Sequence, residues 1–598
     1  MHKKIIIGRK LSREEHLHVL NLHQQGIPVF SFSEAEAPDF AKKISLNAEE
    51  KRTINYQIKD EILAFGDLQV DSQSIADLLC IEHASTWHYH KFRIYFAVRN
   101  LAYQLQLINK HFPKDEALIW YATTDLKHAI NLYPSIRFIF QKKKKTPFNI
   151  RQLLTYFTII LFRLIIVILS KKRKPDYLLY FAERYSSILD KETLQPKGGH
   201  HILEYLIDNL DQRFLLMTEI LMPKPRGDSD YLFSMDYFHT TWNGKPKVPF
   251  ESSLMLGFLN RKVRKAVKES LRKLIQNYSV IEEATLSDPQ KIAFKIFQSL
   301  HKSSGFFLFR YFAAKRYFKK SSLKAIIASD ENSPLSKSIM DAAKHCGIKT
   351  IGVQHGAIHD FNMAYHYTQA DRQKKIMPDV TLVWGRYWKD FLSKNGNYNP
   401  DSVIPVGQLR ADIVPVLLKE TSKNKTGKTI VFASQPQRDP QIRFQAAYDV
   451  FAAVKDLPDT KLQVKLHPRE LNDVEYYKSI AVKAGCSNYS IETTSELYHL
   501  IASCDVLVTC FSTVGTETVY FYKPLIILDH LKQDMMGYVR DGVAFQAIDA
   551  ISLEKLLSEL LQGDLKVNNK KYDQFIENYA YRIDGKVANR CIQAVLAG

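Results

Sequence analysis

His355 stands where an apolar, strand-like run ends. Residues 350–360 read TIGVQHGAIHD, so the imidazole follows the run after one glutamine and precedes a glycine. An imidazole titrates near neutral pH and can take a proton from a reacting hydroxyl group, which accelerates reactions by about 10²–10⁴-fold. His355 is therefore a candidate general base, and the nearby His359 is its rival. The structural alternative is a turn histidine with a satisfied hydrogen bond.

A second histidine ends a later apolar run. The segment KLHPRE places His467 before Pro468, which biases the histidine away from helical backbone angles. Lys465 and Arg469 add two cations beside the imidazole. An imidazole and cations at the end of a strand suit a phosphate oxygen. The alternative is a histidine that only caps a loop.

Small and hydroxyl-bearing residues follow a third apolar run, in CFSTVGTE. Ser512, Thr513 and Gly515 lie between a strand-like DVLVT and a helical GTETVYFY. The first backbone N–H groups of a helix are free to bind an anion, and the helix dipole favours negative charge there. Glu517 could hold a ribose hydroxyl or complete a capping pattern. An ordinary N-cap is the alternative interpretation of the whole segment.

The elements that would position these residues follow a βαβ pattern. Apolar runs alternate with amphipathic segments, and the runs end in Gly, Ser, His or Pro. In open α/β sheets the carboxyl edge of the strands is where ligands bind, so we expect His355 and His467 at such edges. The pattern predicts two Rossmann-like α/β domains, at 175–378 and 379–572. A helix at 573–598 is expected to return to the first domain.

Length, cysteine content and the first residues indicate how many domains the chain has and in which cellular compartment it folds. A length of 598 residues suggests three or four domains. Residues 1–148 predict an appended α/β domain whose role the sequence does not show. The six cysteines are scattered without CxxC pairs, which fits a reducing cytoplasm better than a disulfide framework. The opening MHKKIIIGRK has too short an apolar run for a secretory signal.

Residues 149–174 contain a hydrophobic segment with lysine and arginine clusters at both ends. From Leu153 to Leu169 nearly every residue is apolar, and Arg163 is the only charge. Three interpretations stay open: a buried core helix, a helix docked in the membrane interface, and a membrane-spanning helix. We favour peripheral docking on the inner face of the plasma membrane, since each cation near anionic headgroups contributes about 1 kcal/mol.

The formal net charge of +20 calls for an acidic partner. Nucleic acid, anionic lipid and the phosphates of a nucleotide sugar all qualify. The sequence has no RNA-binding aromatic motif, helix-turn-helix signature or zinc finger, so nucleic acid is not the expected partner. The basic segment 259–274 is predicted to be a solvated or lipid-facing surface, or a docking face for a polyanionic acceptor.

Taken together, the HP strand end, the Ser/Thr-rich helix start and a KP dipeptide before the next strand resemble GT-B nucleotide-sugar transferases. The pattern is similar to that of bacterial sialyltransferases and capsule-polysaccharide Kdo transferases, whose HP and SS/ST motifs hold a cytidine nucleotide. It is also similar to CDP-glycerol-type polymer transferases, in which an HG histidine serves as base. The resemblance covers roughly 175–598, is strongest in 350–360 and 379–530, and is absent from 1–148.

The resemblance implies an α/β fold of GT-B type, with two facing Rossmann-like domains, and a role for each matching residue. His467 would contact the donor phosphate, and Ser512 and Thr513 would hold that phosphate with backbone amides. Glu517 would contact the nucleotide. His355 matches the base-bearing HG position.

Other residues follow from the same resemblance. An acidic-acidic-glycine base motif is lacking, which does not favour a CMP-sialic acid donor and gives the base role to His355 or to Asp330 and Glu331. Ser434 and Gln435 follow a strand directly, as a donor-binding loop would. Arg410 could reach a donor phosphate or pair with the neighbouring Asp412.

The implied enzyme moves a sugar from a CMP- or UDP-type donor to a growing surface polysaccharide or glycolipid, with no metal or other cofactor. Asp228 and Asp230 have metal-binding DxD spacing, but their proline- and glycine-rich surroundings indicate a loop. Three alternatives remain open. They are a CDP-polyol phosphotransferase, a UDP-sugar 2-epimerase-like isomerase, and a non-catalytic scaffold of polysaccharide assembly.

Overall fold

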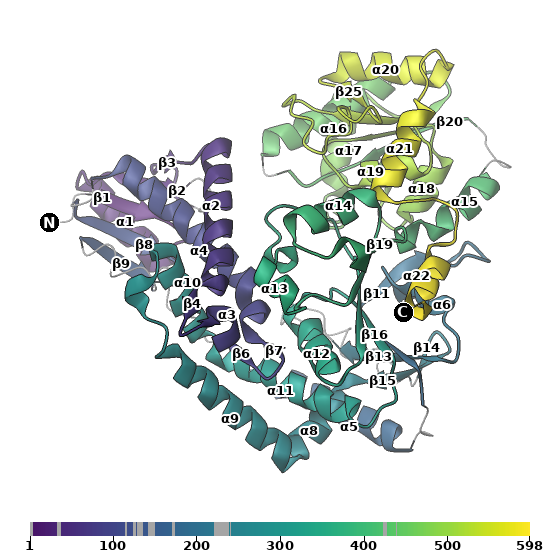
Figure 1. Cartoon of the computed structure of the whole chain (residues 1–598). Helices are drawn as coiled ribbons and strands as arrows, with labels where there is room; N and C mark the ends of the chain where they lie inside the picture. Colours follow the sequence, from purple (N-terminus) through teal and green to yellow (C-terminus); the bar gives the residue numbers. More distant parts are fainter. Residues whose placement is uncertain are drawn as a thin grey trace.

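The computed structural model describes residues 4–32, 37–113, 116–123, 127, 135–140, 150–169, 174–220, 239, 241–421, 427–437 and 439–597. Asp228 and Asp230 lie outside these residues. The described chain contains three parallel or mostly parallel sheets, arranged in the order in which they occur in the sequence (Figure 1).

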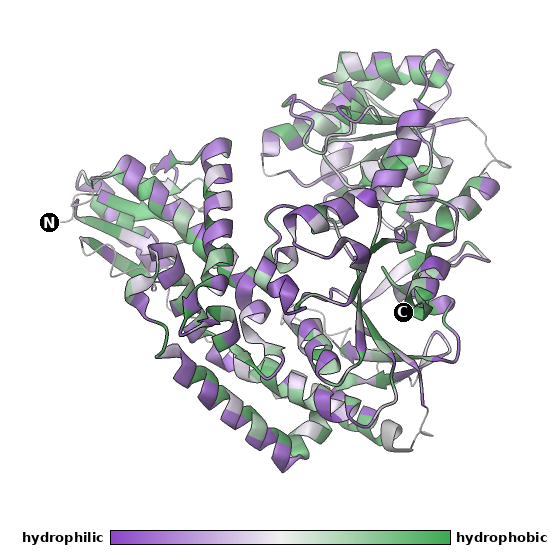
Figure 2. Cartoon of the chain, in the orientation of Figure 1, coloured by the Kyte–Doolittle hydropathy of each residue, from purple (hydrophilic) through white to green (hydrophobic). Residues whose placement is uncertain are grey.

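The first sheet has five parallel strands, and Figure 2 shows how hydrophobic they are. Their spatial order is β3 (Lys42–Ile44), β2 (Val29–Phe32), β1 (Lys4–Ile7), β8 (Leu118–Ala122) and β9 (Ile136–Phe140). Two long helices between β3 and β8 in the chain, α2 (Ala48–Asp67) and α4 (Thr86–His111), pack against α10 (Asp288–Ser299). Their apolar side chains join those of the second sheet in one continuous core. The N-terminal region is therefore packed firmly onto the lobe that follows it.

A buried carboxylate fixes this junction. Asp341, in α12 (Pro334–His345), accepts hydrogen bonds from the backbone N–H and the hydroxyl of Ser85, at 3.0 and 2.6 Å. The hydroxyl of Tyr89 donates to the same carboxylate oxygen at 2.9 Å. Since buried carboxylates are costly unless they are hydrogen-bonded, this contact defines where α4 begins relative to α12.

The second sheet has eight strands and forms the first lobe. Only β14 (Thr241–Trp242) is antiparallel to its neighbour. The parallel strands follow in the order β15 (Lys245–Pro249), β13 (Phe214–Ile220), β10 (Tyr177–Glu183), β16 (Ala325–Ser329), β17 (Lys349–Val353), β18 (Val380–Val383) and β19 (Val403–Pro405). Strands such as β16 are buried along their whole length, which is typical of parallel sheets covered by helices on both faces.

The third sheet forms the second lobe. Its six parallel strands follow the order β22 (Tyr489–Glu492), β21 (Thr460–Lys465), β20 (Lys428–Ala433), β23 (Val506–Thr509), β24 (Leu525–Leu528) and β25 (Phe545–Ala547). Helices α16 (Pro440–Val454), α17 (Val474–Ala484), α19 (Val514–Tyr520) and α20 (Ala550–Gln562) connect or follow these strands. The two Rossmann-like α/β lobes predicted from the βαβ pattern are confirmed by this topology.

The boundary between the lobes differs from the expected one. We predicted that the second lobe begins at 379, yet β18 and β19 pair in the sheet of the first lobe. The third sheet starts only at β20. Local periodicity reveals a strand but not the sheet that the strand joins, because pairing is a long-range contact.

The chain returns to the first lobe at its end. Helix α21 (Asn569–Tyr579) packs on the second lobe, and α22 (Val587–Leu596) packs against the first, near α6 (Glu204–Asp208) (Figure 1). Asp412 accepts hydrogen bonds from the backbone N–H groups of Val587 and Ala588, at 2.7 and 3.0 Å. The carboxylate of Asp412 thereby caps the first turn of α22.

The hydrophobic segment forms helix α5 (Ile150–Leu169). Its Arg163 is buried, and the guanidinium lies 2.7 Å from the carboxylate of Glu183 at the end of β10. Lys247 also binds this carboxylate, at 3.0 Å. Among the described residues, no helix combines the length and apolar character needed to cross a membrane.

Candidate functional site

A β-hairpin brings the two lobes into contact. Strands β11 (Tyr185–Leu189) and β12 (Pro196–His200) follow β10 directly. Ile188 and Leu189 pack with Tyr498 and Leu500 of the second lobe in one apolar cluster. This hairpin therefore forms one wall between the lobes.

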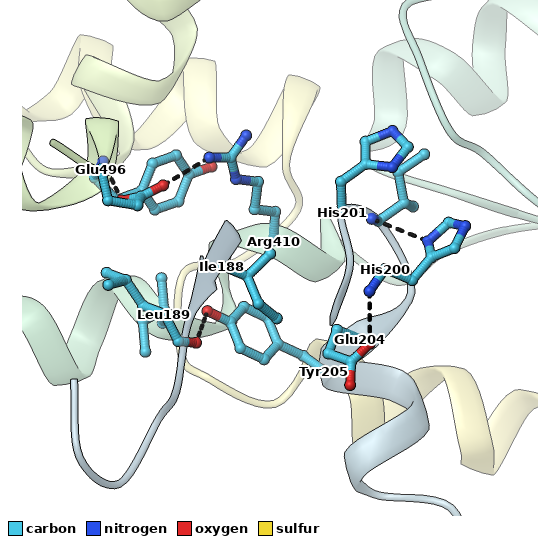
Figure 3. A pocket seen from close by; sticks show the side chains of 11 residues that line it. Ile188, Leu189, His200, His201, Glu204, Tyr205, Arg410 and Glu496 are labelled. Carbon is cyan, nitrogen blue, oxygen red and sulfur yellow. Dashed lines mark hydrogen bonds and ion pairs between the residues drawn. The ribbon is translucent and has the colours of Figure 1, made fainter. Parts of the chain in front are cut away.

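A pocket lies beside the hairpin, and we call it the interlobe pocket (Figure 3). The first lobe contributes His200, His201 and Tyr205, and the second lobe contributes Glu496 and Tyr498. Arg410, which follows β19 on the connection between the lobes, also lines it.

Arg410 bridges the lobes. Its Nη2 lies 2.8 Å from Glu496 Oε1, and its guanidinium lies 4.7 Å from the ring centre of Tyr498. The alternative partner that we considered, Asp412, instead caps α22 and pairs with Lys191 at 3.2 Å. Arg410 thus presents a cation at the point where both lobes meet.

A second pocket, the sheet-edge pocket, lies at the carboxyl ends of β10, β16 and β17. It shares His200, His201 and Ile202 with the interlobe pocket, so the two are adjacent. Arg184, which follows β10, and His355, which follows β17, line it. The predicted position of His355 at a carboxyl edge agrees with this arrangement.

His355 is paired with an acid. Its Nε2 lies 3.5 Å from Asp330 Oδ1, and about a third of its side chain, 32%, is exposed. Asp330 has a φ of +56°, a left-handed conformation that non-glycine residues adopt at a cost, so the surrounding structure holds it in place. Burial raises the pKa of Asp330, and the charges of His355 and Arg184 oppose that rise. An acid beside an imidazole can orient the ring and stabilise its protonated form.

Positive charge accumulates around His201. Burial lowers the pKa of this histidine, and the charges of three neighbours lower it further: Arg184, Arg410 and His355. Arg184, Arg410, His201 and His355 line the two adjacent pockets, and we call them the cationic cluster after the two arginines. Such a cluster can bind phosphate oxygens and stabilise the negative charge of a departing phosphate.

Sequence reasoning missed three members of this site. Arg184 follows the first strand of the first lobe directly, in the same way that His355 follows β17, and this position was the available signal. His200 and His201 follow the pair Gly198–Gly199. His200 is buried, which lowers its pKa to about 3, and its Nδ1 accepts a hydrogen bond from the N–H of Leu203 at 3.2 Å. It shapes the wall of the pocket as a neutral group.

The two other candidate bases do not line either pocket. His359 is exposed, and its Nδ1 accepts a hydrogen bond from the N–H of Phe361 at 3.2 Å, as in a local turn. Glu331 is buried beneath β17, where its Cγ occupies the space next to Gly352. Of the candidates for the base, only His355 and Asp330 face the pocket.

Burial raises the pKa of Glu331 to about 8. Because the acid is neutral in the folded state, its contribution to stability is complete below the unfolded pKa, near 4.5, and is lost as the pH rises toward 8. Glutamine does not ionise, so Glu331→Gln should not show this loss. The free energy of unfolding of the variant, relative to that of the native chain, should therefore rise by a few kcal/mol between pH 5 and about pH 8. Urea unfolding of both proteins across this range measures the difference. A difference that stays constant with pH would contradict it.

In the second lobe, hydrogen bonds join the carboxyl ends of three neighbouring strands. The hydroxyl of Ser434 accepts from the N–H of His467 at 2.9 Å and donates to Glu470 at 2.6 Å. The side chain of Gln435 exchanges two hydrogen bonds with the backbone of Phe511, at 3.0 and 3.2 Å. Ser434 and Gln435, predicted as donor-binding residues, therefore use their polar groups to fix this edge.

His467 lies at this edge but lines neither pocket. Its Nδ1 accepts a hydrogen bond from the N–H of Arg469 at 3.1 Å, and Pro468 and Arg469 are exposed. Lys465, two residues earlier, interacts with Glu496, which lines the interlobe pocket: burial lowers the pKa of Lys465, and the charge of Glu496 opposes that change. The structure does not bring His355 and His467 into one pocket.

The predicted anion-binding segment begins α19. The hydroxyl of Ser512 accepts from the N–H of Val514 at 3.3 Å, and Thr513 is the N-cap residue. Gly515 is buried against Tyr538, where a Cβ would lie 2.6 Å from the ring, so packing requires this glycine. Glu517 accepts a hydrogen bond from the hydroxyl of Tyr498 at 3.1 Å, and burial raises its pKa. Glu517 thus supports a residue that lines the interlobe pocket.

Metal ligands are not grouped in the described residues: no set of three His, Cys, Asp or Glu side chains is arranged to hold an ion there. The sheet-edge pocket holds an imidazole–carboxylate pair, His355 and Asp330, beside the arginines of the cationic cluster.

No protein-family model matches the sequence, and no curated protein matches it either. Solved structures with partial similarity include UDP-GlcNAc 2-epimerase from Neisseria meningitidis bound to UDP-GlcNAc, with a TM-score of 0.43 and 11% identity over 71% of this chain and 100% of that one. The wall teichoic acid polymerase TagF has a TM-score of 0.38 and 12% identity over 75% of this chain and 98% of its own. At these scores the likeness carries no conclusion about the activity of this chain.

Proposed function

We propose that this chain is an enzyme that acts on a nucleotide-activated sugar, with the donor phosphates bound by the cationic cluster. One observation supports the proposal above all. A candidate base, His355, the two arginines Arg184 and Arg410, and the neighbouring His201 converge on adjacent pockets at the meeting of two Rossmann-like lobes. Anion binding and proton transfer are thus available side by side, and this is what transfer from a nucleotide sugar requires.

In the proposed reaction His355 takes the proton of an acceptor hydroxyl, whose oxygen attacks the sugar of the donor. The bond between the sugar carbon and the phosphate oxygen breaks, and the nucleotide leaves with the electron pair. Asp330 stabilises the protonated His355, while Arg184 and Arg410 stabilise the departing phosphate. His467, Ser512 and Thr513 would hold the nucleotide from the adjoining edge of the second lobe. The mechanism needs no metal ion.

The finer proposal is a glycosyltransferase that extends a surface polysaccharide or glycolipid on the inner face of the plasma membrane. The donor would be of the CMP or UDP type. Product analysis distinguishes the alternatives: a phosphodiester product would identify a polyol-phosphate transferase, and conversion of the donor without any acceptor would identify an epimerase.

A thermal-shift screen with CMP, CDP, UDP and GDP tests nucleotide binding directly. A nucleotide present at about 100 times its dissociation constant should stabilise the folded chain by about 2.7 kcal/mol, which raises the midpoint of unfolding measurably. We expect at least one of the four to do so, and Arg184→Gln to reduce the shift. If none of the four shifts the midpoint at millimolar concentration, the proposal fails and a non-catalytic scaffold is favoured.

A further inference from the structure

Helix α5 exposes a stripe of large apolar side chains. Leu154, Phe157, Leu161 and Ile165 each expose 47–60% of their surface. Their spacing of three and four residues places them on one face of the helix. Scattered exposed apolar residues are normal, but a continuous stripe of this kind marks a surface that contacts another protein or a membrane.

The opposite side of α5 fixes this orientation. Ile159, Ile160 and Leu164 are buried, and α5 packs against α8 (Phe250–Leu259). Arg163, on the same buried side, pairs with Glu183. Removing one partner of a buried ion pair is costly, so the helix cannot roll to hide its exposed stripe.

The apolar surface continues at the end of α8. Phe258 and Leu259 expose 59% and 66% of their surface. Helix α8 contacts both α5 and the next helix, α9 (Arg261–Tyr278), along the lower edge of the molecule in Figure 1. The guanidinium of Arg264, on α9, lies 6.0 Å from the ring centre of Phe258. Apolar and cationic groups therefore adjoin each other.

Helix α9 supplies the positive charge. It packs through Val263, Ser270 and Leu274, while Glu269 is its only acidic residue. Figure 2 shows hydrophilic and hydrophobic residues alternating along it. Its exposed cations are Arg261, Lys262, Arg264, Lys265, Lys268, Arg272 and Lys273.

We propose that the stripe of α5, the end of α8 and the cations of α9 form a docking face for an anionic phospholipid bilayer. The apolar side chains would enter the boundary between headgroups and acyl chains, and the cations would contact lipid phosphates. Charge favours this occupant over a second copy of the chain, because a symmetric dimer through this face would bring two α9 helices of like charge together. The inference goes beyond the proposed activity and does not depend on it.

Co-sedimentation of the full chain with vesicles tests the docking face. We expect binding to vesicles that contain phosphatidylglycerol, and much weaker binding to vesicles of phosphatidylcholine alone or at high salt. Leu161→Asp should weaken binding about tenfold or more, because it removes an apolar side chain that would be buried in the bilayer. Replacing Arg264, Lys268 and Arg272 together with Gln should weaken it on the order of 100-fold, at about fivefold for each cation.

Ile551→Asp is the matched control, since Ile551 exposes 80% of its surface on α20 in the other lobe. This variant should bind vesicles as the native chain does, and the melting temperatures of all the variants should remain close to the native value. Native-like binding by Leu161→Asp and by the triple variant would overturn the proposal. A concentration-dependent dimer that Leu161→Asp abolishes would overturn it as well, because the face would then join two copies of the chain.

Discussion

Replacing His355 with alanine is expected to lower kcat with the nucleotide-sugar donor by about 10²–10⁴-fold, the usual contribution of a general base. Nucleotide affinity should fall far less, because two arginines of the cationic cluster remain. Single-turnover measurements give the loss in the chemical step, and calorimetric titration with the nucleotide gives the affinity. The proposal thus predicts that this variant loses most of its turnover and keeps most of its affinity for the nucleotide.

His359→Ala is the control for this experiment. His359 belongs to the same loop but is exposed and lines neither pocket, so its removal should leave kcat nearly unchanged. If His359→Ala abolishes turnover and His355→Ala does not, the assignment of the base is wrong. Asp330→Asn adds a further readout. Because Asp330 pairs with His355, this variant should lower kcat as well, while His359→Ala should not.

The strand pattern could be predicted from the sequence because parallel strands buried on both faces are apolar along their length. The same argument placed His355 and His467 at strand ends. It could not assign β18 and β19 to the sheet of the first lobe, since nothing local to their sequences records which neighbour they pair with. The hairpin of β11 and β12 was missed for a related reason. Its strands are short and contain two Ser and two Gly, and its apolar residues pack with Tyr498 and Leu500 of the other lobe.

The candidate site illustrates the same limit at the level of single residues. Residue type and position predicted that Ser434 and Gln435 lie at a carboxyl edge, but not that their polar groups are already used by His467 and Phe511. Conversely, Arg184 belongs to the site only because β10 ends beside β16, next to Asp330. Proximity of this kind depends on the order of strands in the sheet, which emerges from the whole fold.

Neutralising the arginines of the cationic cluster should weaken nucleotide binding. We expect Arg184→Gln to raise the dissociation constant of the bound nucleotide about 10- to 100-fold, because a hydrogen bond to a charged group contributes about 1.5–3 kcal/mol. Arg184 is exposed, so the substitution should not disturb folding. Calorimetric titration measures the change, and the melting temperature checks the fold. Unchanged affinity in this variant would place the phosphates elsewhere.

Arg410→Gln should weaken binding similarly, but this change also breaks the contact with Glu496 between the lobes. Glu496→Gln separates the two effects. It removes the same ion pair while leaving the charge of Arg410 free to act on a phosphate. If Arg410 binds the donor, the two variants must move affinity in opposite directions, because Glu496→Gln removes a negative charge from the pocket. If the ion pair serves only to join the lobes, both variants should weaken binding alike, since either one loosens the wall that Arg410 and the hairpin share.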